Sequence, residues 1–395
     1  ANFEPQNLAN TVWAYSKAGV EAPLLFEAVA AEALTKIESF KPQELVIVHA
    51  FATAGVAAPA LFAAMAAQAP NVEAINSQGL AKIVWAFASA GVSAPTLFEA
   101  VAEEAPKRLA SSDPRALSSL AWAFSTAGVD APVLFEAVAA EAVSKMAVFD
   151  ARSLSDLFWA FATAKLAQKH RALFVAVAEE AEHKVARFKP RDLSQLAWAY
   201  ASTGASEANR DLFEALAPQA CQKIKLFEPR HVADIVWAFA TARIEAPELF
   251  EAVALEAPRK MAAFDARDLA FTAWAFARAR VAAPALFEAV AAAASTKVSS
   301  FSPQDLARLL WAFSTAGVDS PSLFEVIASS IEAKIGTIGP AARAQLHQVQ
   351  IHLRLEAPRP ALSSLLSRRE AESEYDVENE FARDLALLEQ ALRPP

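Results

Sequence analysis

The chain has 395 residues, and its 36 basic and 45 acidic side chains give a formal net charge of −9. This balance excludes a uniformly basic clamp for nucleic acid, so any such binding must use local basic patches. The single cysteine, Cys221, excludes an internal disulfide and a cysteine-based zinc site.

A tryptophan position recurs along the chain at a spacing of 36 to 39 residues, with histidine in its place once. The position is occupied by Trp13, His49, Trp85, Trp122, Trp159, Trp198, Trp237, Trp274 and Trp311. Self-similarity at this period is typical of a helical-repeat array. We therefore expect nine repeats.

Each repeat predicts two helices joined by a short turn. The first helix opens at a proline, as at Pro5, because proline is tolerated in the first helical turn. The motif Gly-Val-x-x-Pro at 128–132 is a stop-and-restart signal. The second helix, from Pro23 to about Ser39, has apolar residues on one face. Stacked hairpins share one core, so we predict an all-α fold, an α-solenoid of about nine hairpins over residues 1–339.

Two other segments need separate interpretation. The stretch 45–67 lacks charged residues and is long enough to span a membrane, but Gly55 and Pro59 fall at the repeat turn, so we expect two short helices and no membrane span. Residues 340–395, with Gln348 in the tryptophan position, predict a degenerate tenth repeat and a polar C-terminal cap. The chain opens at Ala1 in mid-pattern, so we expect any targeting peptide to be absent from it.

At about 100° per residue, one side of each first helix is left exposed. In the opening repeat it carries Gln6, Asn10, Trp13 and Lys17. We call this side the first-helix face, and its four positions the helix-start, variable, tryptophan and last-turn slots. We expect it to line the groove of the solenoid.

The helix-start slot is basic in five consecutive repeats: Arg115, Arg152, Arg191, Arg230 and Arg267. Lysine recurs near the end of the second helix, at Lys145, Lys184, Lys223, Lys260, Lys297 and Lys334. Two such rows along one edge, beside the N–H groups of helix starts, predict contacts to RNA phosphates. Alternatively, the lysines complement the helix dipole and the arginines pair with nearby acids.

The variable slot holds seven different residue types in the eight repeats in which it is assigned, namely Asn10, Lys82, Ser119, Asp156, Gln195, Asp234, Phe271 and Arg308. Repeat proteins that read single-stranded RNA contact one base per repeat, so variety at one slot is compatible with base reading. The alternative is drift of a solvated position.

The tryptophans either stack on bases or seal the contact between neighbouring first helices. The second role is favoured, because a residue that reads bases should vary between repeats and the tryptophan is nearly constant.

The second repeat is unusual because His49 occupies the tryptophan slot and Ala63 and Ala67 occupy outer positions without charge. An exposed apolar surface of this kind predicts a protein-partner patch, unless an alanine-rich surface is simply tolerated.

The sequence has no phosphate-binding loop, nucleophile elbow or metal-spaced His/Cys cluster. We therefore predict no catalytic or metal site, no cofactor and no enzymatic activity.

The segments 5–15 and 303–313 share Leu-Ala-x-x-x-Trp-Ala-Tyr/Phe and resemble octotricopeptide repeats. They are also similar to the helical arrays of algal and apicomplexan proteins that end in a RAP domain, a group related to FAST-kinase-like organellar proteins. Residues 346–353 resemble the stretch before such a domain. The resemblance implies an imported chloroplast or mitochondrial protein that binds RNA for processing, stability or translation.

Two functions follow as expectations. The first is an organellar protein that binds single-stranded RNA with the first-helix face and a basic edge. The second is a non-catalytic scaffold that holds other proteins in a large organellar assembly. DNA is not an expected partner of either.

Overall fold

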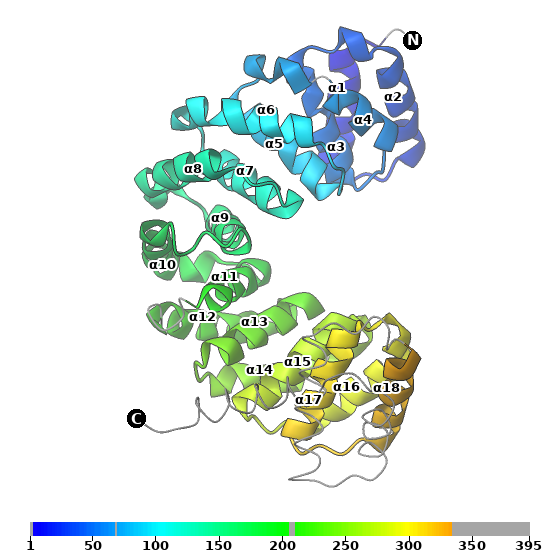
Figure 1. Ribbon diagram of the computed structural model, residues 1–395, viewed down its shortest axis with the longest axis vertical. Coiled ribbons are helices and arrows are strands. Elements are labelled where there is room, and N and C mark those ends of the chain that lie inside the picture. The colour runs from blue at the N-terminus through cyan, green and yellow to red at the C-terminus, as the bar shows by residue number, and fades with distance from the viewer. Residues whose placement is uncertain (1–2, 68, 205–209, 334–395) are drawn as a thin grey trace, which may run out of the picture. The chain divides into compact units, whose positions relative to one another are not determined.

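The computed structural model describes residues 3–67, 69–204 and 210–333. Over these residues all regular elements are helical, and eighteen α-helices follow one another as nine hairpins (Figure 1). The predicted all-α solenoid is confirmed. The predicted C-terminal cap at 340–395 lies outside the described residues, so the boundary at residue 339 stays a prediction.

The two helices of each hairpin alternate along the chain. The first helices are α1 (Pro5–Ala18), α3 (Ile47–Ala54), α5 (Ser77–Ser89), α7 (Pro114–Ala127), α9 (Ala151–Thr163), α11 (Pro190–Thr203), α13 (Pro229–Ala242), α15 (Ala266–Ala279) and α17 (Pro303–Thr315). The second helices are α2 (Pro23–Thr35), α4 (Pro59–Ala66), α6 (Pro95–Glu104), α8 (Pro132–Ser144), α10 (Arg171–Lys184), α12 (Arg210–Lys223), α14 (Pro247–Lys260), α16 (Pro284–Lys297) and α18 (Pro321–Ala333).

Local signals account for the ends of these helices. The Asp113 carboxylate caps α7 by accepting the Ala116 N–H at 2.8 Å. Gly128, which follows α7, has a φ of +66° and so takes the left-handed conformation that ends a helix. The second helix of the first repeat is shorter than predicted, because α2 ends at Thr35 and residues Ile37–Ser39 form a 3-10 turn.

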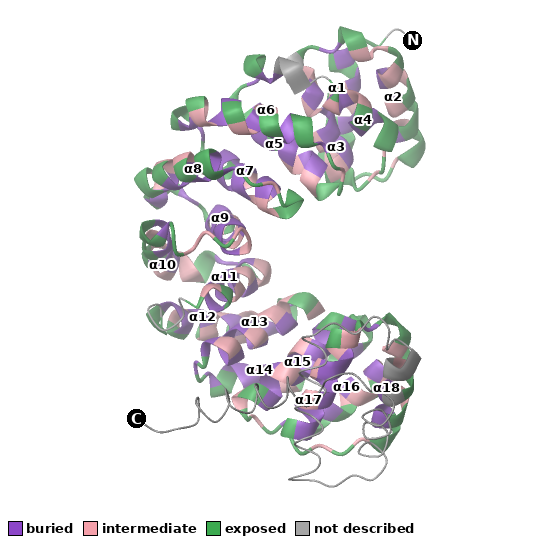
Figure 2. Ribbon diagram, viewed as in Figure 1, coloured by how far each residue is buried: buried purple, intermediate pink, exposed green. Residues whose placement is uncertain are grey.

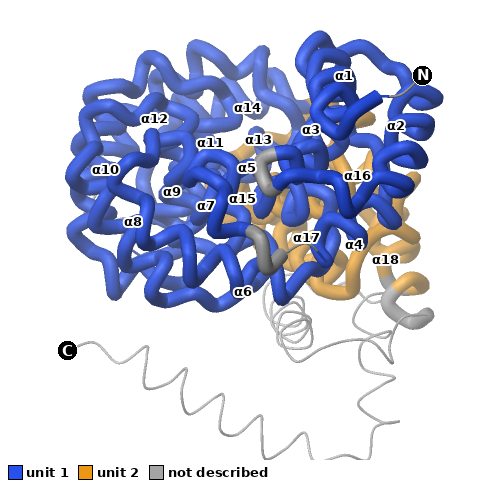
Figure 3. Tube along the Cα trace, turned by 90° about the horizontal axis from the view of Figure 1, so that it is seen from above, with its two compact units in different colours: residues 1–257 blue, residues 258–395 orange. Residues whose placement is uncertain are grey.

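The chain forms two compact units, residues 1–257 and 258–395 (Figure 3). In the first unit, the first helices α1 to α13 pack side by side as one layer, and second helices from α2 to α12 pack beside them. In the second unit, α15 packs on α17 and α16 on α18. Each unit is thus a two-layered stack of hairpins.

The core lies between the two layers (Figure 2). A buried phenylalanine of each of six second helices meets an aromatic ring of the next first helix edge to face, with ring centroids 5.0 to 5.1 Å apart. These pairs are Phe26–Phe51, Phe62–Phe87, Phe98–Phe124, Phe135–Phe161, Phe213–Phe239 and Phe287–Phe313. Edge-to-face rings therefore lock successive repeats together.

The uncharged stretch 45–67 forms the short helices α3 and α4, as predicted. Among the helices that the structure describes, none combines the length and the apolarity that a membrane span requires.

Candidate nucleic-acid interface

The tryptophan slot forms a continuous ladder of rings along the first-helix layer of the first unit. Neighbouring tryptophans from Trp85 to Trp237 have ring centroids 6.2 to 6.4 Å apart and planes tilted by 31 to 35°. In the second unit, Trp274 and Trp311 repeat this contact at 6.1 Å. Rings at this distance contact each other, so each indole joins two first helices. The rings stay partly exposed.

The five helix-start arginines differ in their surroundings. Arg152 and Arg230 are 65% and 67% exposed and lie 3.5 and 3.7 Å from Asp156 and Asp234, one turn later on the same helices. Arg115 and Arg267 are also exposed. Arg191 is the most engaged of the five, because its guanidinium lies 2.7 Å from Asp156 and 3.9 Å from Asp192.

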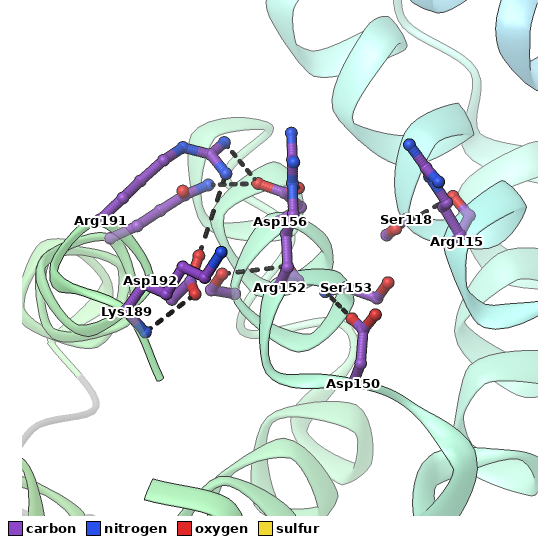
Figure 4. Close-up of polar contacts among 11 residues, drawn as sticks. Arg115, Ser118, Asp150, Arg152, Ser153, Asp156, Lys189, Arg191 and Asp192 are labelled. Carbon is purple, nitrogen blue, oxygen red and sulfur yellow. Dashed lines mark hydrogen bonds and ion pairs between the residues drawn. The ribbon is translucent and has the colours of Figure 1, made fainter. Parts of the chain in front are cut away.

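Asp156, in the variable slot of α9, is a shared acceptor (Figure 4). Its carboxylate lies 2.7 Å from the Arg191 guanidinium of α11 and accepts a 3.2 Å hydrogen bond from the Gln195 amide. Arg152 lies on the same helix at 3.5 Å. The oxygens of Asp156 are thus committed to groups of this chain, two of them from the next repeat.

The same kind of pairing occurs in the second unit. Two guanidinium groups lie over the ring of Phe271, with Arg267 at 4.9 Å and Arg308 at 4.2 Å from its centroid. Arg308 also donates to Asp305 at 2.6 Å, and burial lowers its pKa. Variety in the variable slot therefore has a packing reason as well, since slot residues of neighbouring repeats contact each other.

The remaining variable-slot residues differ in burial, and Asp234 has Arg230 at 3.7 Å. Asn10 and Lys82 are exposed, and Ser119 and Asp234 are half-buried. The predicted base-reading residues are therefore not equivalent, and a role in reading stays a prediction for each of them.

The lysine row has a structural role that the sequence did not reveal. The Nζ of Lys184 donates to the carbonyls of Ala147 and Phe149, at 2.8 and 2.7 Å. The same pair of contacts is made by Lys145, Lys223 and Lys297. Each lysine ties the end of its hairpin to the residues that precede the first helix of that hairpin. These four ammonium groups are thus used within their hairpins, Lys334 lies outside the described residues, and a phosphate contact of the row stays a prediction.

Charge is separated between the two layers. The slots of the first-helix face hold two acidic residues, Asp156 and Asp234, and nine basic ones, namely Lys17, Lys82, Arg115, Arg152, Arg191, Arg230, Arg267, Arg278 and Arg308. The second helices instead carry a row of exposed glutamates, namely Glu27, Glu99, Glu136, Glu214, Glu251, Glu288 and Glu325. The first-helix face is therefore basic although the chain is acidic, which suits a polyanion.

The predicted patch of the second repeat is divided between the two layers. His49 lies in the first-helix layer, where its ring meets Trp85 at 5.0 Å, whereas Ala63 and Ala67 are exposed residues at α4. Burial first, and then the charges of Lys82, Arg115 and Lys17, lower the pKa of His49 to about 4. His49 is thus partly buried against an aromatic ring, with three cations nearby.

The described residues offer little that would support metal binding or a reactive thiol. Among the described residues, no three His, Cys, Asp or Glu side chains come close enough to hold a metal ion. The Cys221 thiol is half-buried, and burial raises its pKa. His347 and His352 lie outside the described residues.

The stacked hairpins and their basic, aromatic face define a helical-repeat protein with a surface suited to polyanions. The model of the RNA-editing substrate-binding complex 6 protein family matches residues 1–240 and, in a second match, 208–331. The chain therefore belongs to this family. Among curated proteins, none matches the chain. The match covers helical repeats but does not distinguish the octotricopeptide or RAP-domain type.

Proposed function

We propose that this chain is a non-catalytic subunit of a mitochondrial RNA-editing complex, in which it binds single-stranded RNA with its first-helix face. The observation that most strongly supports this proposal is the family match, because that family is named for an RNA-editing substrate-binding complex. Of the two organelles expected from the sequence, this relationship favours the mitochondrion over the chloroplast.

The chemistry of the face supports RNA as the ligand. Its guanidinium and ammonium groups form charge-assisted contacts with phosphates. The ladder of indoles presents partly exposed rings, on which bases of any sequence stack. We propose that the variable slot adds base preference, as in octotricopeptide repeats, and that Asn10 and Ser119 are the positions with this role.

Binding is tested with random single-stranded RNA, measured by fluorescence anisotropy over a series of salt concentrations. Replacing Arg115, Arg152, Arg191, Arg230 and Arg267 with glutamine removes phosphate contacts. The slope of log affinity against log salt then becomes shallower by up to about 0.7 per lost contact. The matched control replaces the same five residues with lysine, which keeps the charge. An unchanged slope in the glutamine variant would contradict the phosphate contacts.

A second candidate function is that of a protein scaffold, and the outer layer favours it. Val133 and Val175 on α8 and α10 are 70% and 53% exposed, and Ala63 and Ala67 add an uncharged surface at α4. Exposed apolar surface of this kind is typical of partner surfaces. The variant Ala63→Glu/Ala67→Lys restores ordinary surface charge, and loss of a co-purifying protein is the expected result. Retention of every partner argues against docking at α4.

A further inference from the structure

The first helices α9 and α11 meet on the first-helix face in a diagonal register. The contact between Asp156 in the variable slot of α9 and Arg191 in the helix-start slot of α11 establishes it, at 2.7 Å. At this contact, a variable-slot residue faces the helix-start residue of the next repeat. Here the two charges are opposite and neutralise each other.

If α5 and α7 meet in the same register as α9 and α11, two like charges face each other two repeats earlier. The variable slot of α5 holds Lys82, and the helix-start slot of α7 holds Arg115. The diagonal moves by one slot from each first helix to the preceding one. It therefore continues to His49 in the tryptophan slot of α3 and to Lys17 in the last-turn slot of α1. The electrostatics of His49 agree, since Lys82, Arg115 and Lys17 are the three charges that disfavour its protonated form. We call Lys17, His49, Lys82 and Arg115 the cationic diagonal.

This cluster lacks the counter-charge that the later repeats have. Over the described residues, the side chains of Lys17, Lys82 and Arg115 make no ion pair within the chain. The slots of the first four repeats contain no Asp or Glu. An acid nearby in the sequence, Asp113, is engaged by the Ala116 N–H and the Gln78 amide, at 2.8 and 3.0 Å.

We infer that the cationic diagonal is the principal anion site of the face and takes phosphate groups of single-stranded RNA. Facing cations without a counterion repel each other, and a bound phosphate relieves that repulsion. The adjoining rings of His49 and Trp85 are half-buried and 5.0 Å apart. Their exposed parts favour a ligand with flat bases over an acidic peptide. This inference rests on the proposed RNA binding and specifies where its strongest contact lies.

Two matched substitutions test the site. Arg115→Gln and Arg152→Gln remove the same charge from the same slot of consecutive first helices, but of these two arginines only Arg152 has an acid, Asp156, within ion-pair distance. With random single-stranded RNA in the anisotropy assay, Arg115→Gln and Lys82→Gln each weaken binding about fivefold or more at low salt and lower the salt slope by about 0.7. Arg152→Gln changes affinity by less than about twofold. Unchanged thermal unfolding of each variant confirms that it remains folded.

A second measurement reports on the site itself. The His49 ring is followed by NMR between pH 4.5 and 7, with His49→Gln for assignment, with and without a twelve-residue oligouridine. A phosphate beside His49 offsets the three cations, so the pKa of His49 rises from about 4 toward its ordinary value of 6.5. A purely structural role for Lys82 and Arg115 would not produce this RNA-dependent shift.

The outcomes separate this inference from the proposed function. Equal losses from Arg115→Gln and Arg152→Gln, or an unshifted His49 pKa in bound RNA, overturn the site and leave RNA binding intact. Absence of RNA binding by the parent chain overturns both. A third outcome is that RNA does not bind, that polyglutamate binds the parent chain, and that Lys82→Gln abolishes polyglutamate binding. In that case the cationic diagonal binds an acidic protein, and the inference is wrong.

Discussion

The Nζ of Lys184, at the end of α10, donates a 2.7 Å hydrogen bond to the carbonyl of Phe149, which precedes α9 of the same hairpin. The ammonium group also donates to Ala147 and pairs with Glu180 at 2.6 Å. Lysine suits this position because its long apolar stem reaches across the hairpin while its three donors satisfy backbone carbonyls. The recurrence of lysine therefore has a structural cause.

Replacing Lys184 with methionine keeps the stem and removes these donors. The Lys184 side chain is only 15% exposed, so its carbonyl partners regain water poorly. We expect the free energy of unfolding to fall by about 1 to 3 kcal/mol, measured by urea denaturation. Lys82→Met serves as the control, because Lys82 is exposed, and should change stability by less than about 0.5 kcal/mol. Equal effects would show that Lys184 does not close the hairpin.

The tryptophan ladder predicts a difference between its interior and its end. Trp198 contacts Trp159 and Trp237 at 6.4 and 6.2 Å, whereas Trp13 is 55% exposed. Because Trp198 is only half-buried, Trp198→Ala should cost about 2 to 3 kcal/mol, below the 3 to 5 typical of full burial. Trp13→Ala should cost less than about 1 kcal/mol. A stable Trp198→Ala variant that has lost RNA affinity would instead assign the ring to base stacking.

The repeat architecture was predictable because its signals are local. Pro5 and Gly128 mark helix ends through backbone chemistry, and Leu8 and Val12, which are 3% and 0% exposed, mark the inner side through helical spacing. None of these depends on the rest of the chain.

The contacts of the face were not predictable in the same way. Arg191 and Asp156 are 35 residues apart, and their contact depends on how far α11 is displaced along α9. Sequence periodicity does not give that displacement. Once the displacement between neighbouring first helices is known, the sequence indicates that Lys82 and Arg115 face each other. The variety of the variable slot is then partly explained by neighbouring slots rather than by drift.

Two arginines occupy a backbone position at which other repeats have glycine. Arg243 and Arg280 follow α13 and α15 with φ of +55° and +57°, close to the +66° of Gly128. A side chain in this left-handed region costs about 1 to 2 kcal/mol, partly offset by the greater freedom of glycine in the unfolded chain. Arg243→Gly should therefore raise the free energy of unfolding by about 0.5 to 1 kcal/mol, and Gly128→Ala should lower it by a similar amount. If Arg243→Gly is less stable than the parent chain, the contacts of the Arg243 side chain stabilise the fold by more than the left-handed backbone conformation destabilises it.

The low pKa of His49 predicts how stability depends on pH. Folding lowers this pKa from 6.5 to about 4, mainly through burial. Between these values the unfolded chain binds a proton that the folded chain does not, so the free energy of unfolding falls as the pH is lowered from about 6.5 to 4. Above pH 6.5 His49 is neutral in both states and contributes no pH dependence. Burial also lowers the pKa values of His170 and His231, which act in the same direction.

The contribution of His49 is isolated by comparing the parent chain with His49→Trp. This variant restores the residue found in the other repeats and cannot gain a proton beside Lys17, Lys82 and Arg115. Urea midpoints measured between pH 4 and 8 should show a shallower acid loss in the variant, while the two chains run parallel above pH 6.5. Carboxylates titrate in both chains and cancel in the difference. Parallel curves over the whole range would mean that His49 binds its proton equally well in the folded and unfolded chain, contrary to its position among three cations.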